Sequence, residues 1–170
     1  MANPTMTLIG SPITVGSGGA SSVTFSSIPA TYTDLVIKIS ARTTNGYFRD
    51  SVDVKFNGGT SAGTLKDILA QGSTVASQST SSIQVQIEGD SGTTTNTFGN
   101  AEIYIPNYTS SNYKSLSADA VTENNSASSN ALDLSASLWS NTAAITSISF
   151  AGGGNFMQYS TFYLYGINNS

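Results

Sequence analysis

Hydrophobic and polar residues alternate with a period of two along most of the chain. The alternation is clearest in four stretches, which are residues 35–39, 52–56, 83–88 and 132–138. A period of two places successive side chains on opposite sides of an extended backbone, so each stretch predicts a half-buried β-strand.

The stretch 132–138 makes a specific prediction about burial. Its apolar members, Leu132 to Leu138 at every second position, are assigned to the core, and the alternating Asp133 is assigned to solvent. Trp139, which follows directly, is predicted to lie in the core or at its edge.

Weaker alternation predicts further strands at 5–9, 21–27, 98–105, 113–122, 145–150 and 160–166. The total is about ten strands, and no stretch of ten residues favours a helix. Residues 64–69 are ambiguous, and the polar, serine-rich stretch from Gly72 to Ser82 predicts a long surface loop.

Turn signals separate the predicted strands. Asn57-Gly58 follows a strand directly and predicts a tight hairpin turn, because Asn and Gly accept positive φ. Glycine-rich segments at 16–19, 89–92 and 152–154 interrupt the other runs. Many short strands joined by such turns predict one all-β domain over 1–170, an antiparallel β-sandwich that is jelly-roll-like.

The composition narrows the function classes. Charged residues are 9% of the chain, Ser and Thr together number 50, and the net charge is −4. With no run of Lys or Arg, the sequence predicts neither nucleic-acid binding nor membrane insertion. The chain has no His, so the reference pKa values predict a stability that is nearly flat from about pH 5.5 to 8.

Sequence motifs for catalysis lack their partners. Residues 59–63 match the G-x-S-x-G pattern of a nucleophile elbow around Ser61, but that motif needs a His base, and the chain has none. Without Cys and His, zinc and redox metals lose their usual ligands. The acidic residues are scattered, and neither Asp50 with Asp53 nor Glu88 with Asp90 fits a calcium loop. We therefore predict no catalytic residues, no cofactor and no metal.

Aromatic side chains are the remaining candidates for contact with a partner or a glycan. They fall in two groups, one after the Asn45-Gly46 turn and one around a predicted strand end: Tyr47, Phe48 and Arg49 in the first group, and Tyr104, Tyr108 and Tyr113 in the second. Aromatic residues beside Arg are frequent interface anchors. The alternative is that these rings cap the ends of the sandwich.

Four stretches in this order resemble small virion-associated proteins of tailed bacteriophages of aquatic bacteria, including cyanophages. The first three are 25–36, 54–58 and 138–148. The fourth is 154–167, which contains the most specific match, Ser-Thr-Phe-Tyr-Leu-Tyr-Gly-Ile at 160–167. The segment from Thr60 to Gln71 departs from the family pattern, because it is poor in aromatic residues.

The resemblance implies a non-catalytic virion structural protein that is made in the host cytoplasm and binds other phage structural proteins of the capsid or the tail. A capsid decoration or cement protein is the first expectation. The alternative is a tail-fibre or tail-tip receptor-binding domain that recognises a surface glycan. A homo-oligomer, with a trimer as one option, fits both. A free carbohydrate-binding module and a glycan depolymerase remain as alternatives from other classes.

Overall fold

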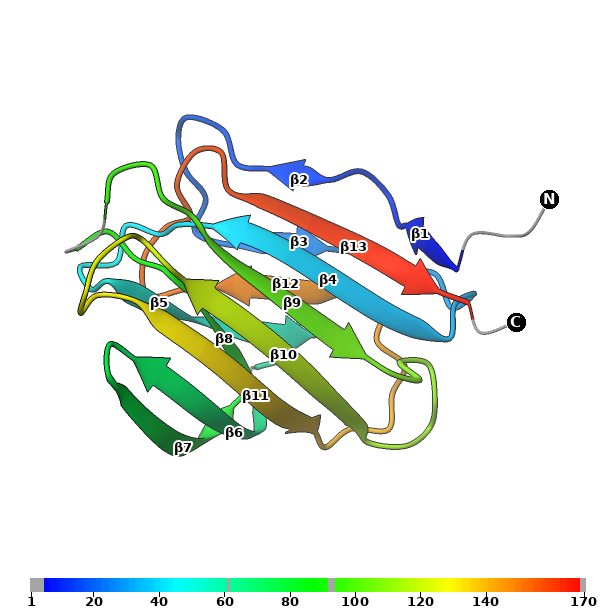
Figure 1. Cartoon of the computed structure of the whole chain (residues 1–170). Coiled ribbons are helices and arrows are strands. Elements are labelled where there is room, and N and C mark those ends of the chain that lie inside the picture. Colours follow the sequence, from blue (N-terminus) through cyan, green and yellow to red (C-terminus); the bar gives the residue numbers. More distant parts are fainter. Residues whose placement is uncertain (1–4, 61, 92–93, 169–170) are drawn as a thin grey trace.

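The computed structural model describes residues 5–60, 62–91 and 94–168, and within these ranges it is all-β, with thirteen strands and no helix (Figure 1). The strands form two antiparallel sheets that pack face to face. The predicted all-β, sandwich-like fold is therefore confirmed, with more strands than the ten expected.

The larger sheet has nine strands. In spatial order they are β1 (Met6–Leu8), β13 (Thr161–Ile167), β4 (Asp34–Ala41), β9 (Gly99–Ile105), β10 (Lys114–Thr122), β11 (Ala131–Trp139), β6 (Ala62–Gln71) and β7 (Thr74–Ser82), and β2 (Ile13–Thr14) also pairs with β13. The smaller sheet has the order β3 (Val23–Phe25), β12 (Ile148–Ala151), β5 (Arg49–Phe56) and β8 (Gln84–Glu88).

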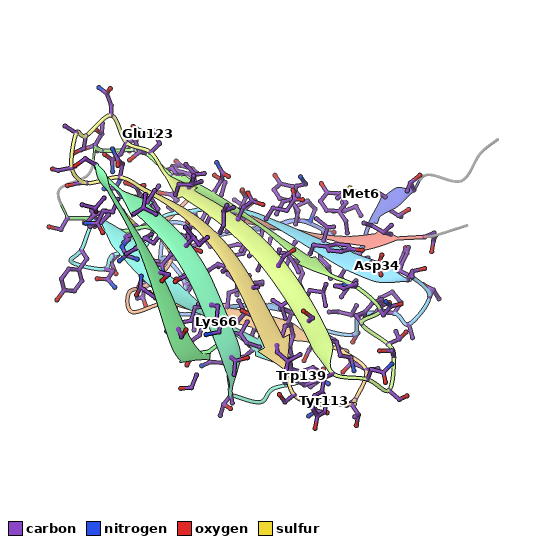
Figure 2. The ribbon with its side chains drawn as sticks, turned by 60° about the horizontal axis from the view of Figure 1, so that its bottom comes forward. Met6, Asp34, Lys66, Tyr113, Glu123 and Trp139 are labelled. Carbon is purple, nitrogen blue, oxygen red and sulfur yellow. The ribbon has the colours of Figure 1, made fainter. Side chains whose placement is uncertain are left out.

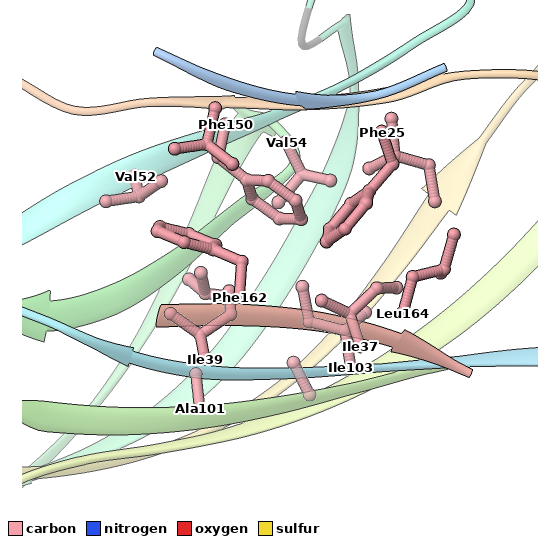
Figure 3. Packing of buried hydrophobic residues seen from close by; sticks show 14 of the residues in the cluster. Phe25, Ile37, Ile39, Val52, Val54, Ala101, Ile103, Phe150, Phe162 and Leu164 are labelled. Atoms are coloured by element: carbon pink, nitrogen blue, oxygen red, sulfur yellow. The ribbon is translucent and has the colours of Figure 1, made fainter. Parts of the chain in front are cut away.

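The core fills the space between the two sheets (Figure 3). Phe150 of the smaller sheet faces Phe162 of the larger one, with ring centroids 5.6 Å apart. Val54 from the smaller sheet and Ile37 and Ile103 from the larger one are fully buried around them. These residues occupy the apolar phase of their strands, as the period of two predicts.

The stretch predicted as a long loop between Gly72 and Ser82 is instead strand β7, and this prediction is wrong. The ambiguous residues 64–69 belong to β6, which pairs with β7 through the two-residue turn Gly72-Ser73. Strand β7 is exposed along almost its whole length. A strand that is exposed to solvent on both faces has no alternation of apolar and polar residues, so the sequence pattern does not predict it.

The burial phase predicted for β11 is also wrong. Leu132 and Leu134 point outward, and Leu134 is 52% exposed, whereas Asp133 is buried. Trp139 is buried, as predicted, and packs on Phe56 with ring centroids 5.1 Å apart. Because Trp139 lies an odd number of residues from Leu134, burying the large indole turns the leucines to the other face.

The turn at Asn57-Gly58 has the expected backbone but a different role. Both residues have positive φ, 54° and 69°, and Gly59 N–H donates to the Phe56 carbonyl at 3.0 Å. It joins β5 of the smaller sheet to β6 of the larger one, so it is a crossing between sheets rather than a hairpin. The Asn57 side chain fixes the crossing, since its Oδ1 accepts from Thr146 N–H at 2.7 Å.

The larger sheet extends beyond the smaller one. Strand β8 ends the smaller sheet, and it packs mainly against β10. Strands β6 and β7 lie further out (Figure 1). The inner face of the β6–β7 hairpin is therefore only partly covered, since Leu65 and Leu69 of β6 are buried whereas β7 is exposed, and this overhang creates the cleft described next.

Candidate functional site

A cleft of about 690 Å³ lies between the overhanging β6–β7 hairpin and the adjacent strands β5 and β8. Its outer wall is the inner face of the hairpin, with Leu65 and Asp67 from β6 and Gln78 and Thr80 from β7. The strand register explains this set, because Asp67 pairs with Gln78 and Leu65 pairs with Thr80, so all four side chains project to the same side.

Amide side chains make up much of the cleft lining. Gln84 and Gln86 come from β8, and Gln71 and Gln78 come from the hairpin. Gln84 Nε2 donates to Asp53 Oδ1 at 2.9 Å, a contact that orients the Gln84 side chain. Each amide has two hydrogen-bond donors and one carbonyl acceptor. The lining can therefore bind a ligand hydroxyl whether that hydroxyl donates or accepts the hydrogen bond.

The first group of sequence-predicted contact residues lies in this cleft. Tyr47, Phe48 and Arg49 line its rim, and Tyr47 is 73% exposed. The Arg49 guanidinium carbon lies 5.8 Å from the Phe48 ring centroid. Gly89 holds the turn in place, because its N–H donates to the Phe48 carbonyl at 3.0 Å and a Cβ there would lie 2.0 Å from the Tyr47 carbonyl oxygen. Only glycine permits this close approach.

Asp50 holds the loops of the same rim together through hydrogen bonds. Its Oδ1 accepts from Asn45 Nδ2 at 2.7 Å and from Gly153 N–H at 3.0 Å. Its Oδ2 accepts from the Thr43 hydroxyl at 2.8 Å and from Gly154 N–H at 3.2 Å. With both oxygens used in this way, Asp50 fixes two loops to each other and is engaged in structure rather than in ligand contact.

Two carboxyl groups, from Asp67 and Asp133, lie together at the inner end of the cleft. They are 7% and 3% exposed, and each has one buried oxygen, Asp67 Oδ1 and Asp133 Oδ2, without a hydrogen-bond partner. Burial, charge repulsion from the neighbouring Asp67 carboxyl and a hydrogen bond with that carboxyl together raise the pKa of Asp133 to about 7, and Arg49 opposes the shift. A proton held between two carboxyl groups is the expected result when like charges cannot both ionise.

Another buried acid, Glu88, contacts the loops beside the cleft. Burial raises the pKa of Glu88, and the side chains of Asn124, Arg42 and Thr97 oppose the shift. Glu88 Oε1 accepts from Asn124 Nδ2 at 2.9 Å. Arg42 in turn forms an ion pair with Asp90, with 2.8 Å between Nη2 and Oδ1. This network links the loops that follow β8 and β10.

The second predicted aromatic group lies away from the cleft. The β9–β10 loop is at the opposite end of the sandwich from the β4–β5 loop that carries Tyr47 (Figure 1). Tyr113 lies there, 58% exposed, near Trp139 and far from Glu123 at the other end of β10 (Figure 2). Tyr104 is partly exposed on the outer face, and its hydroxyl donates to Asp34 Oδ2 at 2.8 Å.

Tyr108 is fully buried, so its prediction as a contact residue is corrected. Its hydroxyl donates to the Pro29 carbonyl, which joins the two Pro-containing corners of the sandwich. Burial raises the pKa of Tyr108. The position of Tyr108 supports the alternative interpretation, in which the ring caps the end of the sandwich.

A second hollow lies on the opposite, outer face of the overhang. It is a trough of about 640 Å³ whose floor includes Leu134 of β11 and Ile68 of β6, which are direct cross-strand partners. Asp119 of β10 and Lys66 of β6 lie at its sides, and Figure 2 shows Lys66 on β6 beside this face. The outward leucines of β11 thus form an exposed apolar strip between polar strands.

Other chemical features are absent from the described residues. Within those ranges no three Asp or Glu side chains gather in a group that could hold a metal ion. No helix there is long and apolar enough to cross a membrane. Ser61 of the G-x-S-x-G match lies outside the described residues, and Ala62 after it opens a strand rather than the helix that the elbow requires.

No protein-family model matches this chain, and neither a curated protein nor a solved structure is found to be similar to it.

Sequence reasoning found one wall of the cleft and missed the other. Tyr47, Phe48 and Arg49 were identified from aromatic clustering. The sequence pattern does not indicate Asp67, Gln78 or Asp133, because it leaves residues 64–69 ambiguous, predicts a loop at 72–82 and assigns Asp133 to solvent. The sequence does contain one signal for the burial of β11. Trp139 lies an even number of residues from Asp133, so burying the indole also turns Asp133 inward.

Proposed function

We propose that this chain is a non-catalytic binding module of a tailed-bacteriophage particle, and that its cleft holds a neutral glycan. The particle role rests on the sequence resemblance, which is strongest at 160–167. The glycan role rests on the cleft, where amide side chains, an exposed Tyr47 and Arg49 line one open space. This combination favours the tail receptor-binding alternative over capsid decoration.

The chemistry of the lining matches a sugar. A pyranose presents hydroxyl groups at its edge, which both donate and accept hydrogen bonds, and Gln71 and Gln78 can meet either need. It also presents a face of C–H groups, which the ring of Tyr47 can cover. The few charges in the cleft, with one Arg49 against the Asp67–Asp133 pair, disfavour phosphate as a ligand.

The geometry of the acid pair argues against the depolymerase alternative. Glycosidases hold their two carboxyl groups roughly 5–5.5 Å or 6.5–9.5 Å apart, so that the sugar or a water fits between them. Asp67 and Asp133 are both buried, and the oxygen of each that lacks a hydrogen-bond partner is shielded from solvent, so neither carboxyl is open to a sugar or a water in this way. We therefore assign the pair to the wall of a binding cleft.

Capsid decoration stays as a second candidate, since a specific feature favours it. The outer trough exposes Leu134 and Ile68 next to hydroxyl-rich strands. Exposed apolar patches rimmed by polar residues are frequent protein-binding surfaces. The copy number on the particle separates the candidates: a cryo-EM map with tens to hundreds of copies would favour decoration, and a handful at the tail would favour receptor binding.

The binding test uses a glycan array built from the surface polysaccharides of aquatic bacteria, followed by titration calorimetry on the hits. Tyr47→Ala and Gln78→Ala should each lower the affinity at least several-fold. Tyr113→Ala is the matched control, because Tyr113 is a similarly exposed tyrosine at the other end of the domain, and it should leave the affinity unchanged. Loss on Tyr113→Ala alone would place the ligand at the wrong end for this proposal.

Salt provides an independent check. A neutral ligand held by hydrogen bonds and ring contact should bind almost equally at about 50 and 500 mM salt, because screening acts on charges. A fall of orders of magnitude would indicate an anionic ligand held by Arg49 and would contradict the neutral-glycan proposal.

A further inference from the structure

Strand β7 ends the larger sheet and leaves a long edge of backbone unpaired. It pairs on one side with β6, and nine residues, Thr74–Ser82, face outward on the other. The other edge strands are short: β1 and β3 have three residues each, and β8 has five and packs against β10. The β7 edge is therefore the longest open edge among the described strands.

This edge carries none of the features that usually protect a sheet against pairing with another chain. Natural edge strands are interrupted by charged residues, proline or a bulge, or they are covered by a loop. Strand β7 reads Thr-Val-Ala-Ser-Gln-Ser-Thr-Ser-Ser, with no charge and no proline. The register irregularity of the hairpin lies near Ala62 and Leu65 of β6, away from the open side.

We propose that the β7 edge binds the β7 edge of a second copy of this chain, antiparallel and around a two-fold axis. Two identical strands pair in this way when each residue tolerates its symmetry mate, which is the requirement of a self-complementary interface. The strand is neutral throughout, so no like charges oppose each other across the axis.

When the strand pairs over its full length, the two-fold axis lies at its middle residue, Gln78. There Gln78 faces Gln78 of the second copy, and a carboxamide can both donate to and accept from its own copy. One step away on each side, Ser77 faces Ser79 of the second copy. The remaining pairs, out to Thr74 with Ser82, are small and uncharged.

The pairing would give each cleft a wall from two chains. Gln78 and Thr80 project into the cleft from the inner face of β7. In the paired sheet the same two residues of the second copy continue that face, so the two clefts lie side by side across the axis. A linear polymer could then contact both copies, although the pairing itself needs no ligand.

The size of the contact sets its strength. A single nine-residue edge buries less than the roughly 1,200–2,000 Å² of a stable interface, so the dimer should be weak in dilute solution. Many copies held close together on a particle would raise the effective concentration and favour the pair.

The absence of native cysteine allows a direct test by disulfide trapping. Single variants Ser77→Cys, Gln78→Cys and Ser79→Cys are oxidised mildly and resolved on a non-reducing gel, after circular dichroism has shown that each is folded. Antiparallel partners bring Cα atoms within the 4.4–6.8 Å that a disulfide spans. Ser115→Cys, an exposed serine on β10, is the control for random collision.

The expected result is a pattern specific to the register. Ser77→Cys and Ser79→Cys should stay monomeric alone and should cross-link when mixed in equal amounts, and Gln78→Cys should cross-link with itself. Self-cross-linking of Ser77→Cys as strong as in the mixture would indicate a parallel pair and would overturn the proposal. Cross-linking no greater than that of Ser115→Cys in every sample would overturn it as well. None of these outcomes depends on a glycan, so the test is separate from that of the proposed function.

Discussion

Asp133 of β11 and Asp67 of β6 are diagonal neighbours on the inner face of the larger sheet, because Asp133 pairs with Leu69 and Asp67 pairs with Ser135. Both are buried, and each keeps one oxygen without a hydrogen-bond partner. Two buried acids in contact are costly when both are ionised, so this relationship connects the cleft to the stability of the whole domain.

The first prediction concerns the pH dependence of stability. The folded-state pKa of Asp133 is raised from 3.8 to about 7, so the folded chain holds a proton that the unfolded chain releases near pH 4. Stability is therefore greatest below about pH 4 and falls as pH rises from there through the folded pKa. Between pH 5.5 and 8 the free energy of unfolding should fall by about 2 kcal/mol, which lowers Tm by roughly 4–8 °C.

Thermal unfolding across this pH range measures the effect. Asp133→Asn should flatten the profile and raise Tm at pH 8, because the amide can donate to Asp67 without ionising. Asp119→Asn, on the exposed outer face of β10, is the matched control and should keep the slope. The slope replaces the flat profile that reference pKa values alone predicted. A wild-type Tm that is constant from pH 5.5 to 8 would contradict a shared proton.

The second prediction compares two leucines of opposite burial. Leu164→Ala removes a side chain that is 1% exposed and should lower the free energy of unfolding by roughly 2–5 kcal/mol. Leu134→Ala removes one that is half exposed in the outer trough, and it should cost less than about 1 kcal/mol. Urea denaturation measures both. Equal losses would mean that β11 buries its leucines, as the sequence pattern alone suggested.

The third prediction concerns the Tyr108 corner. Tyr108→Phe leaves the ring in place but removes the donor to the Pro29 carbonyl, and it should destabilise the fold by about 0.5–1.5 kcal/mol. Tyr113→Phe, which changes an exposed hydroxyl, should be neutral within about 0.5 kcal/mol. Denaturant midpoints give the stability of the two variants. An equal loss in both would contradict a stabilising role for the hydrogen bond from Tyr108 to Pro29.

The fourth prediction concerns catalysis. The purified chain should not hydrolyse glycans, peptides or esters, because both acids of the Asp67–Asp133 pair are buried and the chain has no His to act as a base. Release of reducing ends and of labelled peptide fragments should equal that of buffer. Turnover that disappears in Asp133→Asn, while a glycan still binds, would contradict this assignment and would make the cleft an active site.

The alternation of apolar and polar residues is enough to predict the class of fold and most of the strands. A period of two in 35–39 and 52–56 is sufficient for that, because a strand with one dry face must alternate whatever its neighbours are. The same alternation places Ile37 and Val54 on one face of their strands, and both are fully buried. The sequence also identified Tyr47, Phe48 and Arg49 as a group, since residues adjacent in sequence stay together in any fold.

The position of the cleft and the residues that line it depend instead on how strands distant in sequence pair. Strand β7 has no dry face, so its existence depends on pairing with β6, a contact between strands that no local pattern encodes. The phase of β11 depends on which of its faces meets the smaller sheet, and the burial of Trp139 outweighs that of Leu134. The burial of Trp139 turns Asp133 inward beside Asp67. The two acids meet because β6 and β11, which are 60 or more residues apart in the sequence, pair with each other.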